Sequence, residues 1–185
     1  MILKLKSLEL CAFKGVKNGR FEFGNGTTTV TGSNGTGKST LFTAWLWLTC
    51  DRDVDLTGNP DIRPIDAAEA TPRVTAVLDI DGKTVKICKY QKRSVSKPNA
   101  EGISKISLTN SYEINDVPKT EKDFRSQLAA EGIDWDRFLA LSHMDVFTSG
   151  KKEEQRKVLF EMASSKSDYD VAQITEGAIA PKQLL

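Results

Sequence analysis

One stretch of the 185-residue sequence decides the fold: Gly32-Ser33-Asn34-Gly35-Thr36-Gly37-Lys38-Ser39-Thr40. Its first eight residues match the pattern G-x-x-x-x-G-K-[ST] at every fixed position. In this pattern the glycines let backbone N–H groups curl around phosphate oxygens, and the N-terminus of a following helix adds partial positive charge. The stretch therefore predicts a loop that binds a nucleoside triphosphate, most simply ATP with Mg²⁺.

The residue types assign a role to each part of this loop. Lys38 supplies a point charge to the outer phosphates, the hydroxyl of Ser39 is expected to bind Mg²⁺, and Thr40 supports it. Backbone contacts are expected from the preceding residues Gly32, Ser33, Asn34, Gly35, Thr36 and Gly37. The alternative is a glycine-rich turn that only caps a helix, and the flanking elements argue against it.

Those flanking elements are a strand before the loop and a helix after it. Residues 27–31 are all β-branched and favour a strand, whereas apolar residues recur at helical spacing from Lys38 to Cys50. Two further strands are expected upstream, at 2–13 and around 21–23, with turns at 18–19 and 25–26. Trp45 and Trp47 cannot share one helix face, so at least one is expected in the core.

The downstream sequence predicts a second, antiparallel sheet followed by helices. Residues 74–80 and 84–90 flank Asp81-Gly82, which is a strong hairpin signal, and 106–108 and 112–114 could pair as short strands. Thr120 and Asp123 resemble a capping box that opens a helix ending at Gly132. Further helices are expected at 134–141 and 151–164.

A second motif complicates the choice of enzyme class, because many kinds of NTPase share the phosphate loop. Asp79 follows an apolar run and precedes Asp81-Gly82, so it imitates the metal-linked carboxylate of a self-contained GTPase-like enzyme or phosphotransferase. An ordinary hairpin turn explains the same residues, and no Asn-Lys-x-Asp motif for guanine follows. The hairpin interpretation is therefore preferred.

Composition excludes several classes. The 26 basic and 25 acidic residues nearly cancel, so affinity for nucleic acid would have to come from local clusters. No apolar run approaches the ~20 residues of a membrane helix, and no signal peptide opens the chain, so no membrane contact and a cytoplasmic location are expected. Three widely spaced cysteines predict neither disulfides nor a zinc site, but small buried residues: Cys11, Cys50 and Cys88.

One basic cluster breaks this balance. The stretch from Lys83 to Lys97 contains six cations and no carboxylate: Lys83, Lys86, Lys89, Lys92, Arg93 and Lys97. Weak, sequence-independent DNA binding is one interpretation. A solvated edge strand that lysines guard against aggregation is the other, and the sequence leaves both open.

At this point the layout resembles the N-terminal half of an SMC-like or SbcC-like ATPase head, in the DNA repair and chromosome-organising branch of the ABC-type ATPases. The resemblance rests on the opening strand with Phe13-Lys14-Gly15-Val16, the phosphate loop, and the helix from Leu41 to Leu48. It implies an α/β fold with α+β character: a P-loop NTPase, ABC-ATPase-like N-terminal lobe with a mixed or antiparallel sheet and flanking helices. It covers 1–185 as one lobe, with strands and P-loop helix over 1–50, a β-rich insert over 51–118 and a helical segment over 119–185.

The resemblance also implies partners and missing parts. In that family two heads sandwich the nucleotide, and the signature motif, the Walker B acids and the switch His lie in a C-terminal half, which this sequence lacks. A C-terminal lobe, a second head, DNA and a nuclease subunit are the implied partners, in a bacterial or phage-infected cell and near its nucleoid. Lys14, at the family's basic position, could reach a phosphate or the partner head, or be a solvated surface lysine. The family's Q-loop glutamine is missing near Ser142-His143-Met144, where His143 is either its substitute or a plain polar residue.

The leading hypothesis is therefore the ATP-binding lobe of a DNA-associated ATPase, which hydrolyses ATP in the complete protein and binds it without efficient hydrolysis alone. Two alternatives stay open: a self-contained P-loop enzyme that uses Asp79, and a non-catalytic module in which nucleotide controls binding of a partner chain.

Overall fold

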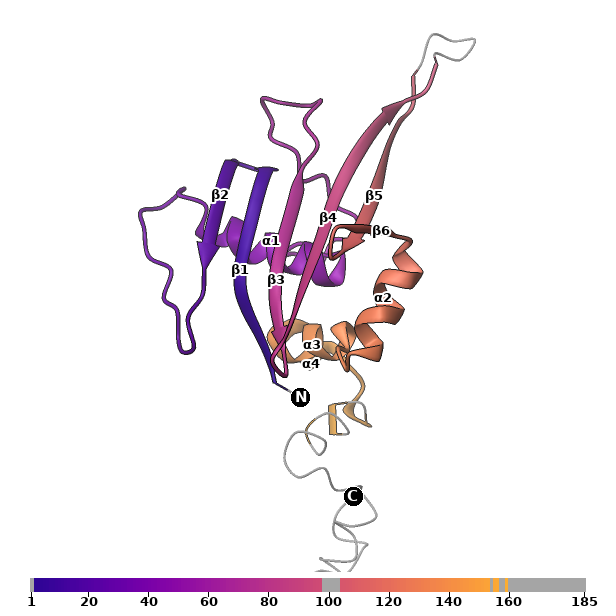
Figure 1. Cartoon of the computed structure of the whole chain (residues 1–185). Helices are drawn as coiled ribbons and strands as arrows, with labels where there is room; N and C mark the ends of the chain where they lie inside the picture. Colours follow the sequence, from indigo (N-terminus) through magenta and orange to yellow (C-terminus); the bar gives the residue numbers. More distant parts are fainter. Residues whose placement is uncertain (1, 98–103, 154, 157–158, 160–185) are drawn as a thin grey trace, which may run out of the picture. The chain divides into compact units, whose positions relative to one another are not determined.

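The protein was analysed as a computed structural model that describes residues 2–97, 104–153, 155–156 and 159 (Figure 1). It divides into two compact units, Met1–Asp134 and Trp135–Leu185, which are described separately. The first unit contains a sheet, a long helix packed on one of its faces, and a shorter helix.

The sheet of the first unit has six strands in the order β2-β1-β3-β4-β5-β6, and every neighbouring pair is antiparallel. Because β1 pairs with β3, the downstream strands extend the first sheet, and the expectation of a second sheet is wrong. The strands are β1 (Leu3–Phe13), β2 (Val16–Glu22), β3 (Arg73–Ile80), β4 (Lys83–Val95), β5 (Ile106–Ile114) and β6 (Val117–Lys119).

The first hairpin turns earlier than the sequence suggests. Phe13 pairs with Val16, so Lys14 and Gly15 form the turn, with Lys14 at φ 49°. Asn18 and Gly19, expected as a turn, instead lie inside β2 and pair with β1. The hydrogen-bonding edge of β1 continues past them, and this non-local pairing overrides the local turn preference.

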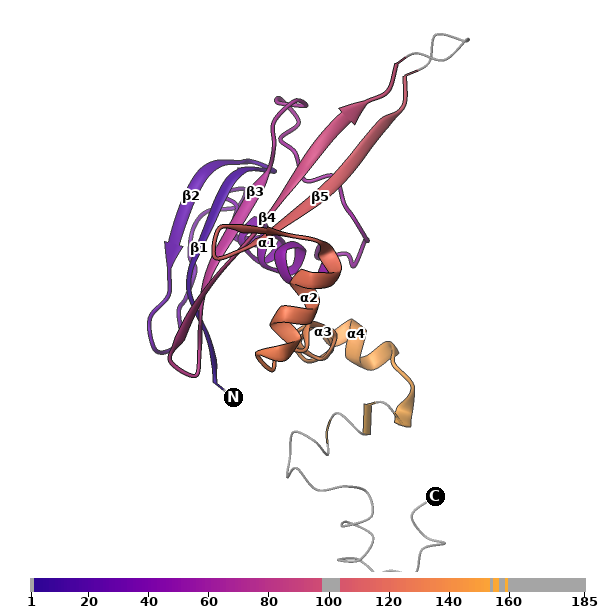
Figure 2. The same ribbon diagram turned by 45° about the vertical axis from the view of Figure 1, so that its right-hand side comes forward.

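The second hairpin is the one that the sequence predicts. Asp81 and Gly82 connect β3 to β4 with φ of 50° and 88°, the left-handed conformation that this pair tolerates. The two short strands expected at 106–108 and 112–114 form one continuous strand, β5, which pairs with β4 from Ile87 to Val95. This long β4–β5 ribbon rises beyond the rest of the sheet (Figures 1 and 2).

The helix after the glycine-rich loop is α1 (Lys38–Cys50), as predicted, and it packs on one face of the sheet. Trp47 is fully buried, and the centroid of its ring lies 5.6 Å from the centroid of the Phe13 ring. Apolar residues of α1, β1, β3 and β4 form the core with it: Leu8, Leu10, Phe13, Ala44, Leu46, Leu48, Val74, Ala76, Leu78, Val85 and Ile87. Cys50 and Cys88 are buried as expected, but Cys11 is exposed.

The strand expected at 27–31 before the loop is absent. These residues are exposed and pair with no strand among the described residues. β-branched residues favour extended backbone, but a strand also needs a hydrogen-bonding neighbour, which the described part of the chain does not provide here.

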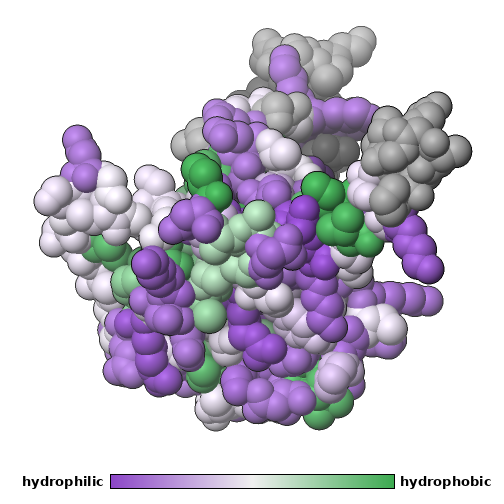
Figure 3. Space-filling model, turned by 90° about the horizontal axis from the view of Figure 1, so that it is seen from above, coloured by the Kyte–Doolittle hydropathy of each residue, from purple (hydrophilic) through white to green (hydrophobic). Residues whose placement is uncertain are grey.

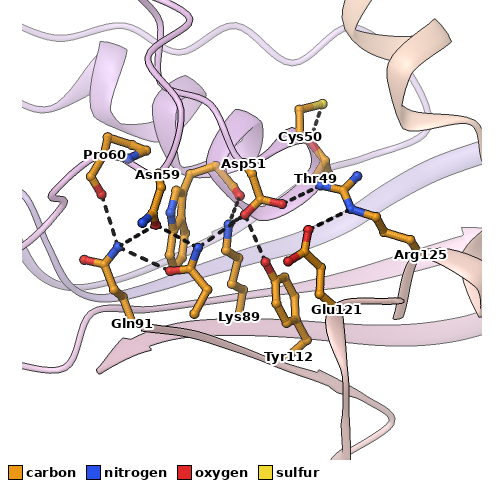
Figure 4. A network of polar contacts seen from close by, with 12 residues as sticks. Thr49, Cys50, Asp51, Asn59, Pro60, Lys89, Gln91, Tyr112, Glu121 and Arg125 are labelled. Atoms are coloured by element: carbon orange, nitrogen blue, oxygen red, sulfur yellow. Dashed lines mark hydrogen bonds and ion pairs between the residues drawn. The ribbon is translucent and has the colours of Figure 1, made fainter. Parts of the chain in front are cut away.

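A polar network fixes the C-terminal end of α1 (Figure 4). Asp51 ends the helix in the left-handed conformation. Its carboxylate accepts hydrogen bonds from Lys89 and Tyr112 and forms an ion pair with Arg125. The Lys89 side chain is fully buried, lies 4.1 Å from the centroid of the Trp47 ring and donates to the Trp47 carbonyl at 2.7 Å. The network thus joins α1 to β4, β5 and the next helix.

That next helix is α2 (Glu121–Ala130), whose N-cap Thr120 accepts a hydrogen bond from the Asp123 backbone N–H at 3.1 Å, as predicted. The second unit contains α3 (Trp135–Ser142) and α4 (Met144–Ser149). The helix expected at 151–164 falls largely outside the described residues. Among the residues that are described, no helix has the length and apolar character needed to cross a membrane.

Candidate nucleotide site

The glycine-rich loop and the first hairpin enclose a cavity of about 340 Å³. The loop contributes an unbroken run of seven residues, from Asn34 to Thr40, and the hairpin contributes Gly15 and Val16. Seven of the nine loop residues singled out from the sequence therefore line one cavity. Gly32 and Ser33 stand just before it and support it through their carbonyl groups.

The backbone of the loop takes the conformation that an anion cradle needs. Gly35 and Gly37 have φ of 81° and 91°, values that L side chains rarely adopt, and a Cβ on Gly37 would lie 3.4 Å from Val16 Cγ2. Gly37 is also the N-cap of α1, with no side chain capping the helix and no acidic residue in its first turn. The N-terminus of the helix, where backbone N–H groups lack partners within the helix and the dipole is positive, therefore borders the cavity without a competing negative charge.

Lys38 holds the loop closed on itself. Its Nζ donates to the carbonyls of Gly32 at 2.8 Å and Ser33 at 2.6 Å, and Thr36 Oγ1 donates to the Ser33 carbonyl at 2.8 Å. An ammonium group has three donors, so one N–H of Lys38 is left for a phosphate oxygen. The cradle is therefore formed in the isolated chain, with its cation already beside the cavity.

Ser39 is exposed and lines the same cavity, so its hydroxyl could hold a metal ion there. No carboxylate lines this cavity, and no cluster of three or more metal-binding side chains occurs among the described residues. The donor set fits Mg²⁺, which binds readily through one protein oxygen while phosphate oxygens and water fill its other positions.

Asp79 lies far from this cavity. Asp79 pairs with Lys4 near one end of β1, whereas Gly15 of the cavity follows the other end. Lys4 and Phe13 are nine residue steps apart, and at about 3.3 Å per step along a strand this is about 30 Å. Asp79 Oδ1 accepts a hydrogen bond from the Gly82 N–H at 2.8 Å, so it stabilises the hairpin turn. This geometry argues against Asp79 as the metal-linked carboxylate of a self-contained enzyme.

Lys14 lies next to the phosphate cavity in a neighbouring one. This second cavity, about 450 Å³, is lined by Lys14, Gly15, Asp61, Arg63, Ile65 and Asp66, and it shares Gly15 with the first. The backbone N–H of Lys14 donates to the Ile62 carbonyl at 2.7 Å, which fixes the turn against this segment.

Arg63 in this second cavity was missed by the sequence analysis, since an arginine in a loop carries no motif. Its side chain is 5% exposed, Nη2 binds Asp61 Oδ2 at 2.7 Å, and Nη1 is buried with no hydrogen-bond partner among the described residues. Burial raises the pKa of the Asp61 carboxyl, but the hydrogen bonds and charge of Arg63 outweigh it and hold that pKa below its usual value.

The basic stretch from Lys83 to Lys97 proves to be mixed in character. Lys89 is buried, and three other cations form ion pairs: Lys83 with Glu131, Lys86 with Asp116 at 2.6 Å, and Arg93 with Glu69. The stretch is therefore neither a continuous DNA-binding surface nor a uniformly solvated edge. Its distal part has exposed lysines, Lys92 and Lys97, that form no ion pair with a residue the structure describes.

His143 belongs to the second unit, where it precedes α4 as its N-cap without a side-chain capping bond. Its proposed role in place of a glutamine stays a prediction.

The chain is similar to known proteins over most of its length. Residues 7–178 match the AAA domain family. The chromosome partition protein Smc of Fusobacterium nucleatum is 28% identical over 144 residues, covering 70% of this chain and 11% of that protein. The chromosome partition protein Smc of Rhodopirellula baltica is 27% identical over 187 aligned positions, covering 92% of this chain and 14% of its own length.

Among solved structures, the recombination mediator protein RecF with ATP aligns with a TM-score of 0.49 at 21% identity, over 64% of this chain and 29% of that one. The chain spans only 11% and 14% of the length of the two Smc relatives. The family match over nearly the whole sequence, together with the P-loop fold, shows that the chain belongs to the AAA domain family, as an SMC-like N-terminal ATPase lobe.

Proposed function

We propose that the chain is the ATP-binding lobe of a larger SMC-like ATPase, and that Gly32 to Thr40 hold Mg-ATP. The observation that carries this proposal is the preformed cradle, in which seven consecutive loop residues line one cavity beside an uncapped helix N-terminus. Lys38 and the backbone N–H groups bind the phosphates, and Ser39 binds the metal. Lys14, one turn residue away from the cavity, is positioned to extend the anion site.

We propose that a C-terminal lobe attaches beside the nucleotide cavity. A groove of about 660 Å³ borders Lys38 and Ser39 and is lined by apolar residues, including Phe42 and Val30, which are 42% and 45% exposed. Val30 belongs to residues 27–31, which have no strand partner among the described residues. We propose that the C-terminal lobe of the full-length protein covers this groove and pairs with these residues, since the chain spans at most 14% of its Smc relatives.

Hydrolysis then depends on parts outside this lobe. Turnover needs a group that orients the attacking water and donors that stabilise charge on the γ-phosphate, besides the cradle itself. Neither is found among the residues that line the cavity. We propose that a C-terminal lobe and a second head supply both, so that the complete protein is an ATPase and this chain alone only binds ATP.

The biological setting follows from the relatives. Both are described as chromosome partition proteins, so we propose DNA as a partner of the complete protein, in repair, recombination or the processing of chromosomal or phage DNA. A nuclease subunit and a cytoplasmic, nucleoid-associated location stay predictions of the resemblance. A module that retains ATP and never hydrolyses it, in any assembly, is the competing function.

Calorimetric titration of Mg-ATP into the wild type and Lys38→Ala tests the site. The variant loses one charge-assisted contact to phosphate, worth roughly 1.5 to 3 kcal/mol, so its dissociation constant should rise at least about tenfold. Lys14→Ala, at the edge of the cavity, should give a smaller rise. An unchanged dissociation constant for Lys38→Ala would remove the basis of the proposal.

A further inference from the structure

The long ribbon formed by β4 and β5 extends away from the part of the sheet that α1 covers (Figures 1 and 2). Near its base, Lys89 and Tyr112 point toward α1, where both contact Asp51. From Lys92 onward on β4, and before Asn110 on β5, the side chains are largely exposed on both faces.

The register divides the distal ribbon into two faces of different chemistry. Strand residues alternate between faces, so the pairs Val95–Ile106 and Arg93–Leu108 lie on the face of Lys89 and Tyr112. The pairs Lys92–Thr109 and Ser94–Ser107 occupy the opposite face. Ser96 and Lys105 continue this face, and the Ser96 N–H donates to the Lys105 carbonyl at 2.9 Å. The six exposed residues of this opposite face, here called the ribbon face, are Lys92, Ser94, Ser96, Lys105, Ser107 and Thr109.

The ribbon face contains two lysines, four hydroxyl groups and no carboxylate. Lys92 Nζ lies 5.3 Å from the centroid of the Tyr90 ring, and neither Lys92 nor Lys105 forms an ion pair with a described residue. Arg73, toward the base of the same sheet face, lies 4.9 Å from that ring, but it also forms an ion pair with Glu113 at 3.9 Å, so the unpaired positive charge of this face comes from Lys92 and Lys105. The basal lysines of the hairpin differ, because Lys83 and Lys86 are neutralised by Glu131 and Asp116.

We infer that the ribbon face binds the sugar–phosphate backbone of duplex DNA, without regard to sequence. Lysine and hydroxyl groups are the side chains that contact phosphate oxygens, and a two-stranded β-ribbon fits the major groove. Seen from above, the surface shows many hydrophilic side chains interspersed with apolar patches (Figure 3). This inference rests on the proposed function, because it locates on this lobe the DNA contact that the complete protein is proposed to make.

A protein partner is the other kind of ligand to consider. It would favour the opposite face, where Val95 and Ile106 are 52% and 53% exposed. DNA is the favoured ligand because the six residues of the ribbon face are all polar and carry only positive charge, whereas the opposite face offers a protein partner only the two exposed apolar side chains Val95 and Ile106. The two faces also provide variants that separate the two ligands.

The test measures fluorescence anisotropy of a short labelled DNA duplex with the full chain, over a salt range of about 50 to 200 mM. The variant is Lys92→Gln with Lys105→Gln. The matched control is Lys83→Gln with Lys86→Gln, which removes the same charge from the same hairpin. Each lost phosphate contact lowers the slope of log affinity against log salt by about 0.9, so the variant should lose about 1.8 in slope and at least tenfold in affinity at ~50 mM salt.

The control pair should change affinity by less than about twofold, since those lysines already have carboxylate partners. Equal losses in both variants, no DNA binding by the wild type at low salt, or a loss confined to Val95→Ser with Ile106→Ser would each overturn the inference. Mg-ATP titration of the same samples separates the two proposals. Intact ATP binding without DNA binding refutes the ribbon alone, whereas lost ATP binding in the wild type refutes the nucleotide lobe.

Discussion

Replacing Asp51 by Asn should destabilise the first unit by an amount that depends on pH. Asp51 is the only carboxylate that pairs with Lys89 among the described residues, and the Lys89 side chain is fully buried beside Trp47. Asn keeps the shape and an acceptor oxygen for Tyr112, so the variant removes mainly the negative charge. Burial lowers the pKa of Lys89 to about 8, even though the charge of Asp51 opposes this shift.

The size of the effect follows from this pKa. Without its counter-ion, Lys89 is expected to lose its proton in the folded variant. At pH ~7, which is about one unit below the wild-type pKa of about 8, deprotonation costs about 1.4 kcal/mol. Arg125, 37% exposed, also loses its ionic partner, at a cost of about 1 kcal/mol after solvent screening. The total is about 2 to 3 kcal/mol near pH 7. It should fall to about 1 kcal/mol near pH 9, where Lys89 of the wild type is itself mostly neutral.

Urea-induced unfolding followed by tryptophan fluorescence measures this at both pH values. Glu121→Gln is the matched control, because its carboxylate is 58% exposed and pairs with Arg125 at 3.3 Å, so its removal should cost less than about 0.5 kcal/mol at either pH. The reasoning is refuted if Asp51→Asn costs no more than the control near pH 7, or if its cost does not decrease at the higher pH.

Three further predictions concern single residues. Between about pH 7.5 and 9.5, the wild type should gain about 2 kcal/mol of unfolding free energy relative to Lys89→Met, because the pKa of Lys89 falls from 10.5 to about 8 on folding and the unfolded chain therefore binds more protons in this pH range. Measuring the unfolding free energy of both proteins against pH checks this, and a difference that does not change with pH contradicts it. Asp79→Ala should leave the dissociation constant of Mg-ATP unchanged in calorimetry, since Asp79 stabilises a distant hairpin; a loss of binding would restore the self-contained enzyme. Ser39→Ala should reduce the extent to which Mg²⁺ strengthens ATP binding, measured with and without the metal, and an identical Mg²⁺ effect in both proteins would exclude Ser39 as a ligand.

Local signals in the sequence predicted the elements that depend on few residues. The helix from Lys38, the Asp81-Gly82 turn and the Thr120 cap are each set by neighbours within one turn of chain, and all three are confirmed. The glycine-rich loop belongs to the same class, because the conformations of Gly35 and Gly37 follow from the missing side chains.

Features that depend on distant partners were not predictable in this way. Pairing of β1 with β3 merges what the sequence suggested were two sheets, and pairing of β1 with β2 absorbs Asn18 and Gly19 into a strand. Lys89 occurs in a run of surface-like lysines, yet the register places it under Trp47 beside Asp51. The strand expected at 27–31 had the right composition but has no partner among the described residues.

The most direct test of the central claim measures ATP binding and ATP hydrolysis on one sample of the chain. Mg-ATP titration is run beside steady-state phosphate release, with Lys38→Ala as the control for contaminating ATPases. The account predicts ATP binding that Lys38→Ala weakens at least about tenfold, with phosphate release at background, because positioned catalytic groups worth about 10² to 10⁴-fold each are supplied from outside the lobe. Turnover near ~1 per second by this chain alone, abolished by Lys38→Ala, would contradict it.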